Sequence, residues 1–250
     1  MINRVLRLFK IARKLSTSGA VDTINQIYNL PTTINIFFNL ISIGSEKNIL
    51  NNQKKPGERL CIALESMGTT FIKLGQFLAT RPDILGDELA QNLEKLQDKL
   101  PAFDTYEAKK IIKKEVGETQ FNKILKISEP IAAASIAQVH IANIEIENQS
   151  KEVAIKILRP NIEKLFNEEL DALMLFAYIV ENTISKAKRL KLVEVVYLLR
   201  EITNIEMDLR FEAAAANELY ENTKLDVGFN VPKIYWNYTT KKILTLDKVE

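Results

Sequence analysis

The sequence is poor in residues that interrupt regular structure and in residues that form covalent or metal links. Its 250 residues include eight glycines, seven prolines, one cysteine and one histidine. The scarcity of glycine and proline favours helices over a turn-rich β fold. The single cysteine, Cys61, excludes an intramolecular disulfide and is expected to be a reduced, half-buried thiol. No apolar run approaches the ~20 residues that a membrane-spanning helix requires.

A strong net charge is also lacking. The chain has 34 basic and 32 acidic residues and a net charge of +2. No global field therefore attracts nucleic acid, and we expect no nucleic-acid partner.

The N-terminal segment departs from this balance, because five basic residues precede the first acidic residue, Asp22. The basic residues are Arg4, Arg7, Lys10, Arg13 and Lys14, and an apolar face is formed by Val5, Leu8, Ala12 and Leu15. The pattern fits an interfacial membrane helix or a targeting segment. It fits equally an ordinary basic helix packed on the rest of the protein.

A regular apolar stripe follows a loop at 45–55. Its members recur at steps of four and three: Leu60, Leu64, Met67, Phe71, Leu74 and Leu78. This spacing predicts one long amphipathic helix, with Lys73 and Gln76 projecting together from the opposite side. Gly68 and Gly75 align on the flank between, which suggests that something packs closely there. A solvated polar face with incidental glycines is the alternative.

Local signals set the limits of the next helices. Pro56 suits a first turn, and Arg81-Pro82 marks the expected end of the long helix. A second helix is predicted from Asp87 to Lys99. Asp104-Thr105-Tyr106-Glu107 resembles a capping box that opens a third.

The second half of the chain changes period. We expect β structure at 131–146, a turn at 147–150, a strand at 152–158, helices at 162–184 and 193–220, and short strands at 233–237 and 242–246. The order strand, turn, strand, helix, strand, strand is typical of the small lobe of a protein kinase.

Lys156 ends a Val-Ala-Ile-Lys segment on the second clear strand. In kinases such a lysine contacts the α- and β-phosphates of the nucleotide and is held by a glutamate of a helix. The alternative is a strand lysine that points to solvent.

An alanine-rich segment stands where a kinase has its glycine-rich phosphate loop. It begins Ala132-Ala133-Ala134-Ser135. Alanine restricts positive φ and adds Cβ atoms, so the loop is expected to be stiffer and differently shaped. The segment predicts nucleotide binding in an altered geometry, or a small-residue turn without a ligand.

Glu206 and Glu212 lie on the last predicted long helix, six residues apart. They would project about 120° apart and could not serve one lysine together, although they could serve two. Taken singly, each could equally be a solvated surface charge.

Together these residues resemble the UbiB family of atypical kinases. The similarity runs from about Glu58 to the C-terminus, with motifs at 71–76, 96–101, 132–140, 156–160, 206–217 and 231–232. It implies that Lys156 contacts nucleotide phosphate and that Glu212 is its helix partner. It also implies that Lys73 and Gln76 belong to a regulatory lid in which Lys73 pairs with Glu206. The alanine-rich residues would contact the nucleotide, and His140 would be structural.

The resemblance implies an α+β, mostly helical fold in three parts. These are a basic helical segment and linker at 1–55, a helical extension at 56–128 and a kinase-like small lobe with a short antiparallel sheet at 129–250. It also implies ATP or ADP with Mg²⁺ as cofactors, and ubiquinone-biosynthesis proteins or lipid precursors as partners. The expected place is peripheral at a bacterial inner membrane, or at the mitochondrial matrix face.

The catalytic half of a kinase is not found in this sequence. The only histidine is His140, so no His-x-Asp loop exists, and no Asp-Phe-Gly occurs. We therefore expect no catalytic residue and no metal ligand set here, with the large lobe absent and the chain truncated at the hinge. The alternative function is a non-catalytic helical module that binds a membrane or a partner, the remnant of a disrupted gene.

Overall fold

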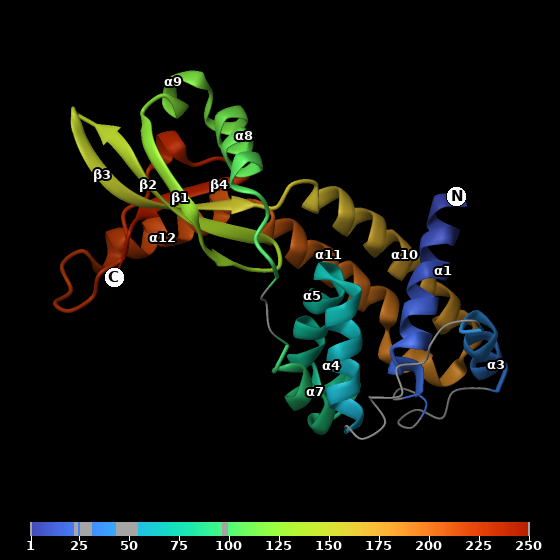
Figure 1. The fold of residues 1–250 in the computed structure, drawn as a ribbon. Helices are drawn as coiled ribbons and strands as arrows, with labels where there is room; N and C mark the ends of the chain where they lie inside the picture. Colours follow the sequence, from blue (N-terminus) through green and yellow to red (C-terminus); the bar gives the residue numbers. More distant parts are fainter. Residues whose placement is uncertain (1, 23–24, 26–31, 44–54, 97–99, 250) are drawn as a thin grey trace. The chain divides into compact units, whose positions relative to one another are not determined.

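A computed structural model describes residues 2–22, 25, 32–43, 55–96 and 100–249. The chain forms two compact units. The helical unit comprises Met1–Asp98 and Lys164–Arg200, and the sheet unit comprises Lys99–Glu163 and Glu201–Glu250. The chain is mostly helical and carries one four-stranded antiparallel sheet, which confirms the α+β fold class (Figure 1).

The described part of the helical unit is built from helices. They are α1 (Ile2–Thr17), α3 (Thr32–Ile41), α4 (Pro56–Met67), α5 (Thr69–Ala79), α6 (Pro82–Leu85), α7 (Asp87–Leu93), most of α10 (Ile162–Thr183), η2 (Ser185–Leu190) and the start of α11 (Leu192–Glu206). Helices α4, α5 and α7 pack on one another, and α1 packs on α3 and α4.

The long amphipathic helix predicted around Lys73 is wrong as a single helix, because it breaks at Gly68. This glycine ends α4 and begins α5 with φ 99° and ψ −170°, a conformation that is essentially restricted to glycine. Its backbone N–H donates to the carbonyl of Glu65 at 3.2 Å. The apolar periodicity runs through the break, so the first four residues of the stripe are buried and the last two are half-buried.

The predicted close approach is confirmed at Gly75 and not at Gly68. A Cβ atom on Gly75 would lie 2.2 Å from Cδ1 of Leu96 and 2.8 Å from Cδ1 of Leu64. A Cβ atom on Gly68 would meet nothing within 4 Å. The two glycines therefore have different causes: close packing at one and backbone conformation at the other.

The neighbouring boundaries follow the local signals in part. Pro56 opens α4, and α5 ends at Ala79, just before Arg81-Pro82. The second helix is shorter than expected, because α7 ends at Leu93. Residues 97–99 of that prediction, and residues 45–54 of the predicted loop, lie outside the described residues.

The N-terminal helix α1 packs on its own unit. Ile11 and Ala12 are buried, and Ala12 clusters with Phe38 and Ile41 of α3. Arg7 forms an ion pair with Glu168 of α10. Lys14 donates to the backbone carbonyl of Ser66 at 2.9 Å. These contacts favour the packed basic helix of the two alternatives; the side chains of Arg4 and Val5 lie outside the described residues.

Cys61 is half-buried and free, as expected. Its thiol donates to the carbonyl of Asn92 at 3.0 Å. Burial, together with the nearby Glu65 carboxylate, raises the pKa of Cys61 to about 11, so the thiol stays protonated near neutral pH.

The sheet unit holds four strands and the helices around them. They are α8 (Thr105–Val116), α9 (Glu118–Phe121), β1 (Ile124–Ala133), β2 (Ala137–Ile146), β3 (Gln149–Leu158), α12 (Leu209–Thr223), η3 (Trp236–Tyr238) and β4 (Ile243–Asp247). The strands follow chain order, β1-β2-β3-β4, and each pairs antiparallel with the next. The predicted turn between β2 and β3 is confirmed, and Glu147 and Asn148 hold positive φ there.

Three strand and helix boundaries differ from the predictions. The single β segment expected at 131–146 is two strands, and β1 begins earlier, at Ile124. The strand expected at 233–237 is one β-bridge, from Ile234 to Leu246, followed by η3. The long helix expected at 193–220 is two helices, α11 and α12, separated at Met207-Asp208.

One face of the sheet forms the core of the sheet unit. Val153, Ile155 and Ile157 of β3 are buried there with Ala108 and Ile112 of α8. Because strand side chains alternate, the intervening residues face the other side. Figure 1 shows α8 above the sheet and α12 below it.

Candidate functional site

The face of the sheet opposite α8 carries Lys156. Its neighbours Ile155 and Ile157 are fully buried in the core, whereas Lys156 is half-buried on the other side. The alternation of β3 therefore removes the lysine from the core and presents it beside α12.

The register of the sheet aligns Lys156 with the alanine-rich segment. Ala132 pairs with Val139, Val139 with Lys156, and Lys156 with Leu244. Directly paired residues have Cβ atoms about 5 Å apart on the same face of a sheet. One row across all four strands thus holds the start of the alanine-rich segment and the lysine.

Glu212, in the first turn of α12, forms an ion pair with Lys156. The Lys156 Nζ atom lies 2.9 Å and 2.6 Å from the two carboxylate oxygens of Glu212. The side chains are 29% and 50% exposed, so the pair is open to solvent on one side. Leu209 and Ala213 are buried, which seats this helix beside β4.

The alanine-rich segment ends β1 and forms a tight loop. Ala132 and Ala133 are the last residues of β1, and the N–H of Ala134 donates to the carbonyl of Ala137 at 2.8 Å. Ser135 is fully buried. Residues 132–138 all have negative φ, so the loop lacks the left-handed conformations that glycine allows.

The proposed lid residues lie on separate elements. Lys73 and Gln76 are half-buried on α5 of the helical unit. Glu206 is the last residue of α11 and belongs to the sheet unit. The pairing of Lys73 with Glu206 stays a prediction.

The helical argument about Glu206 and Glu212 is wrong, because the two residues are on different helices. Asp208 interrupts the helix between them and caps α12. The directions of the two side chains therefore depend on how α11 and α12 are oriented, and the rotation of about 100° per residue within a single helix does not relate them.

His140 is structural, as expected. It is fully buried on β2, its Nδ1 lies 2.8 Å from the carbonyl of Ser128, and its Nε2 lies 2.8 Å from Nε2 of Gln138. A neutral ring that donates from Nδ1 and accepts at Nε2 satisfies both contacts. The Gln138 side chain also bonds both backbone groups of Phe103, so this histidine is part of a fixed buried network.

The sequence predicts no role for Arg159. It lies directly after β3, and its side chain donates to the carbonyl of Ala134. The family motif at 156–160 includes this arginine but assigns it no role, and its place after an apolar strand end does not identify a partner 25 residues away.

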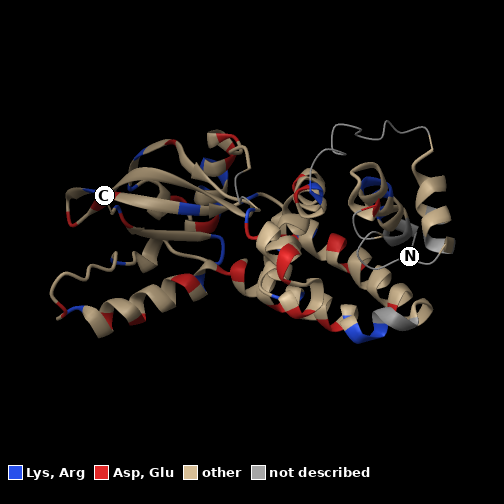
Figure 2. Ribbon diagram, turned by 90° about the horizontal axis from the view of Figure 1, so that it is seen from below, with Lys and Arg blue, Asp and Glu red and all other residues tan. Residues whose placement is uncertain are grey.

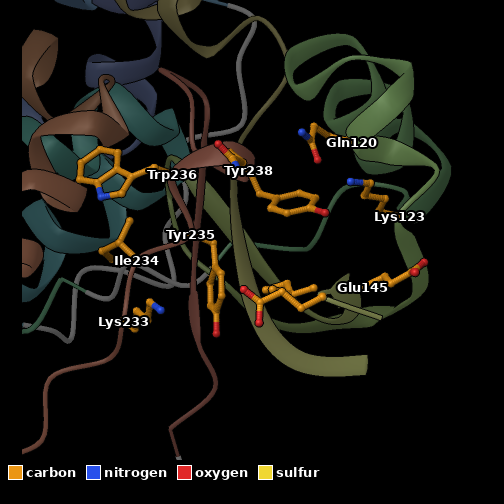
Figure 3. Close-up of a pocket in the computed structure, with 11 residues that line it drawn as sticks. Gln120, Lys123, Glu145, Lys233, Ile234, Tyr235, Trp236 and Tyr238 are labelled. Carbon is orange, nitrogen blue, oxygen red and sulfur yellow. The ribbon is translucent and has the colours of Figure 1, made fainter. Parts of the chain in front are cut away.

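A cavity of about 330 Å³ lies elsewhere in the sheet unit (Figure 3). Its lining includes Lys123 and Lys233 with the aromatic side chains of Tyr235, Trp236 and Tyr238, and none of the proposed nucleotide residues. The Tyr235 hydroxyl donates to the Asp247 carboxylate at 2.6 Å. Burial tends to raise the pKa of Asp247, but hydrogen bonds from Tyr235 and Lys151 outweigh it and lower that pKa.

The described residues provide neither a metal cluster nor a membrane span. In these ranges, no three His, Cys, Asp or Glu side chains come together as a metal site. Nor is any described helix long and apolar enough to cross a bilayer. Figure 2 shows basic and acidic residues on both units, as the nearly balanced charge leads one to expect.

Comparison with known proteins connects this chain to one family. The ABC1 atypical kinase-like domain matches residues 95–250. The Probable protein kinase UbiB of Marinobacter nauticus is 36% identical over 250 residues, covering 99% of this chain and 44% of that protein. Its namesake from Pseudomonas aeruginosa is 38% identical over 196 residues, covering 77% and 36%. That from Azotobacter vinelandii is 36% identical over 192 residues, covering 76% and 35%. The chain spans less than half the length of these curated relatives.

Proposed function

Since the chain belongs to the ABC1 atypical kinase-like family, which includes the UbiB proteins, we propose that its sheet unit is a kinase-like small lobe that binds ATP or ADP. The observation that carries the proposal is the Lys156–Glu212 ion pair on the face opposite the core. In kinases an equivalent pair holds the lysine where it meets the α- and β-phosphates.

The Lys156 ammonium group has three donors, so it can bind phosphate oxygens while Glu212 keeps it oriented. Glu212 lies in the first turn of α12, where a negative side chain is favoured by the helix dipole. We expect the carboxylate to hold the amine in one position rather than to contact the nucleotide.

A second row of the sheet fits the base of a nucleotide. Ile141 pairs with Ala154, and Ala154 with Leu246, on the same face as Lys156. All three side chains are half-buried, which leaves a shallow apolar surface. This surface lies next to Lys156 on the same face of the sheet, because Ala154 precedes Lys156 by two residues on β3. A purine stacked there would place its phosphates near Lys156 and the alanine-rich residues Ala132, Ala133, Ala134 and Ser135.

The remaining roles belong to the same proposal. Lys73, Gln76 and Glu206 would form a regulatory lid, and the three parts 1–55, 56–128 and 129–250 would be the basic segment, the extension and the small lobe. The whole protein would be an atypical kinase or ATPase that supports ubiquinone biosynthesis at a membrane surface.

Among the described residues no three His, Cys, Asp or Glu side chains come together, so we assign no Mg²⁺ ligand to this chain. These 250 residues also lack the His-x-Asp and Asp-Phe-Gly segments that a kinase uses for catalysis. We therefore expect nucleotide binding with negligible phosphoryl transfer. ATP turnover by this chain that disappears in Lys156→Ala would contradict the expectation of negligible phosphoryl transfer.

Thermal unfolding of the chain with and without ADP or ATP tests the binding. A ligand at 100 times its Kd stabilises a protein by about 2.7 kcal/mol, and we expect such a shift in the wild type. Lys156→Ala should remove it. Lys248→Ala is the matched control, because it breaks another lysine–glutamate pair of the sheet unit, with Glu152 at 2.8 Å. No shift in the wild type would favour the non-catalytic module instead.

A further inference from the structure

Arg159 holds the alanine-rich loop with both its backbone and its side chain. Its backbone N–H donates to the carbonyl of Ile136 at 2.8 Å. Its Nε and Nη2 atoms donate to the carbonyl of Ala134 at 3.0 Å and 2.8 Å. One residue therefore makes three hydrogen bonds to two carbonyls of a loop that joins β1 to β2.

These bonds determine the direction of the loop amides. In a trans peptide the C=O and the following N–H point in opposite directions. When Arg159 fixes the carbonyl of Ala134, it also fixes the N–H of Ser135. Ser135 is itself fully buried, so the fixed peptide sets the path of the loop around it. Phosphate loops bind their ligands through backbone N–H groups, whose directions depend on that path.

The chemistry of this contact requires arginine. A guanidinium group presents several donors in a rigid plane, so two of them reach one carbonyl at the same time. A lysine in this place would keep the charge and lose the planar fork. Nη2 also lies 3.4 Å from the carbonyl of Leu100, which is longer than an ordinary N–H···O hydrogen bond.

We propose that Arg159 is a positioning residue for the nucleotide: it holds the alanine-rich loop in one conformation before the ligand arrives. The inference rests on the proposed nucleotide site. Arg159 lies three residues after Lys156, so the segment that carries the proposed phosphate-binding lysine also carries the residue that holds the loop. In kinase phosphate loops glycine supplies freedom; here alanine together with the arginine removes it.

The expected consequence is that the loop is already ordered before nucleotide binds, so it loses little conformational entropy on binding. Interactions that order a binding loop beforehand increase affinity, because less entropy is lost on binding. Removal of the Arg159 side chain should therefore weaken ADP binding, although the phosphate lysine is intact.

The test compares Arg159→Lys and Arg159→Ala with Arg81→Lys. Arg81 is a matched control, because its Nε and Nη2 also donate to a single partner, Asp83, at 2.8 Å and 2.7 Å in the helical unit. Hydrogen exchange of the ligand-free 250-residue chain is measured first. We expect faster exchange at 134–137 in both Arg159 variants, unchanged exchange in α8, and no change in Arg81→Lys.

ADP affinity is measured next by calorimetry. We expect Arg159→Lys and Arg159→Ala to weaken it about tenfold, which corresponds to ~1.4 kcal/mol. Unchanged exchange at 134–137, or unchanged or tighter ADP binding, would overturn the inference. If the wild type binds no ADP, the proposed function fails; the exchange result still shows whether Arg159 orders the loop.

Discussion

At the scale of single residues, Gly68 and Gly75 show two different reasons for glycine in a helical region. Gly75 lies where two buried leucines, Leu64 and Leu96, leave no room for a Cβ atom. Gly68 has open space and a backbone conformation that other residues rarely adopt. Their spacing in the sequence suggested one shared cause, and only the three-dimensional contacts separate them.

A double-mutant cycle distinguishes these causes. We expect Gly75→Ala to lower the free energy of unfolding by about 1 kcal/mol, because overpacking costs ~1–3 kcal/mol and exceeds the helical gain of about 1 kcal/mol from alanine. Gly68→Ala should cost roughly 1–3 kcal/mol through backbone strain. In a Leu96→Ala background the first cost should shrink, and the second should not change. Urea unfolding measures all of these values.

Equal coupling of both glycines to Leu96 would contradict this explanation, since only Gly75 is near that side chain. So would a Gly75→Ala variant that is more stable than the wild type, because it would show that the leucines move aside without cost.

At the scale of elements, the start of α12 controls where Glu212 stands. Asp208 caps this helix: its carboxylate accepts from the backbone N–H of Arg210 at 3.2 Å and from the Arg210 guanidinium at 2.9 Å and 2.7 Å. The N–H of Leu209 donates to the carbonyl of Lys241 at 2.9 Å. The helix therefore begins at a fixed place beside β4.

Loss of this cap should affect both stability and nucleotide binding. We expect Asp208→Ala to lower the free energy of unfolding by about 1 kcal/mol, the usual cost of removing an N-cap. It should also weaken ADP binding, because the first turn that carries Glu212 becomes less ordered. Asp208→Asn retains a neutral cap and should lose less of both. Urea unfolding and ADP titration measure the two effects.

The pH dependence of this cap follows from its partner. Hydrogen bonds from Arg210 lower the pKa of Asp208 below its ordinary value of 3.8, against the opposing effect of burial. A lowered pKa in the folded state contributes stability above the unfolded value and loses it as the pH falls through the folded value. The advantage of the wild type over Asp208→Asn should thus be full at neutral pH and disappear in acid. A constant difference down to pH 2 would contradict this origin.

The elements that could be predicted are those whose signals are local. Asp104 accepts from the N–H of Tyr106 at 2.6 Å and caps α8, as its capping pattern indicated. The sequence does not predict the break at Gly68, because apolar periodicity continues across it. The sequence predicts the start of β1 too late, because none of its residues is fully buried, its burial does not alternate strictly and its pairing is irregular around Pro130.

The contacts of the site were harder to predict from the sequence than the elements of the fold. Lys156 and Glu212 are 56 residues apart, and their contact depends on the packing of α12 beside β4. No spacing rule predicts such a contact; the family resemblance proposed the pair, and the coordinates place the two side chains together. Arg159 lies in a family motif, but the resemblance gives it no partner, and a backbone carbonyl as partner has no signature in the sequence.

At the scale of the whole molecule, the chain passes between its two units after Asp98, Glu163 and Arg200. The second crossing falls near the start of α10 and the third within α11. The proposed lid draws on both units, since Lys73 belongs to the helical unit and Glu206 to the sheet unit. A test of this lid must therefore change one residue in each unit and measure whether the two changes affect each other.

Charge reversal provides that test. If Lys73 pairs with Glu206 over the nucleotide, Lys73→Glu and Glu206→Lys each place like charges together and should weaken ADP binding. The double variant restores opposite charges and should recover affinity, with a coupling free energy of about 1–2 kcal/mol in the range typical of interacting residues. ADP titration of the four proteins measures the coupling.

Glu201→Lys is the matched control, because Glu201 is an exposed glutamate of the same helix, α11, in the same unit. Combined with Lys73→Glu it should show additive effects, since distant residues couple by less than ~0.5 kcal/mol. Additive effects for the Glu206 pair as well would remove the lid from the proposal. Because Lys156, Glu212 and the alanine-rich loop all lie within the sheet unit, the nucleotide site itself would survive that result.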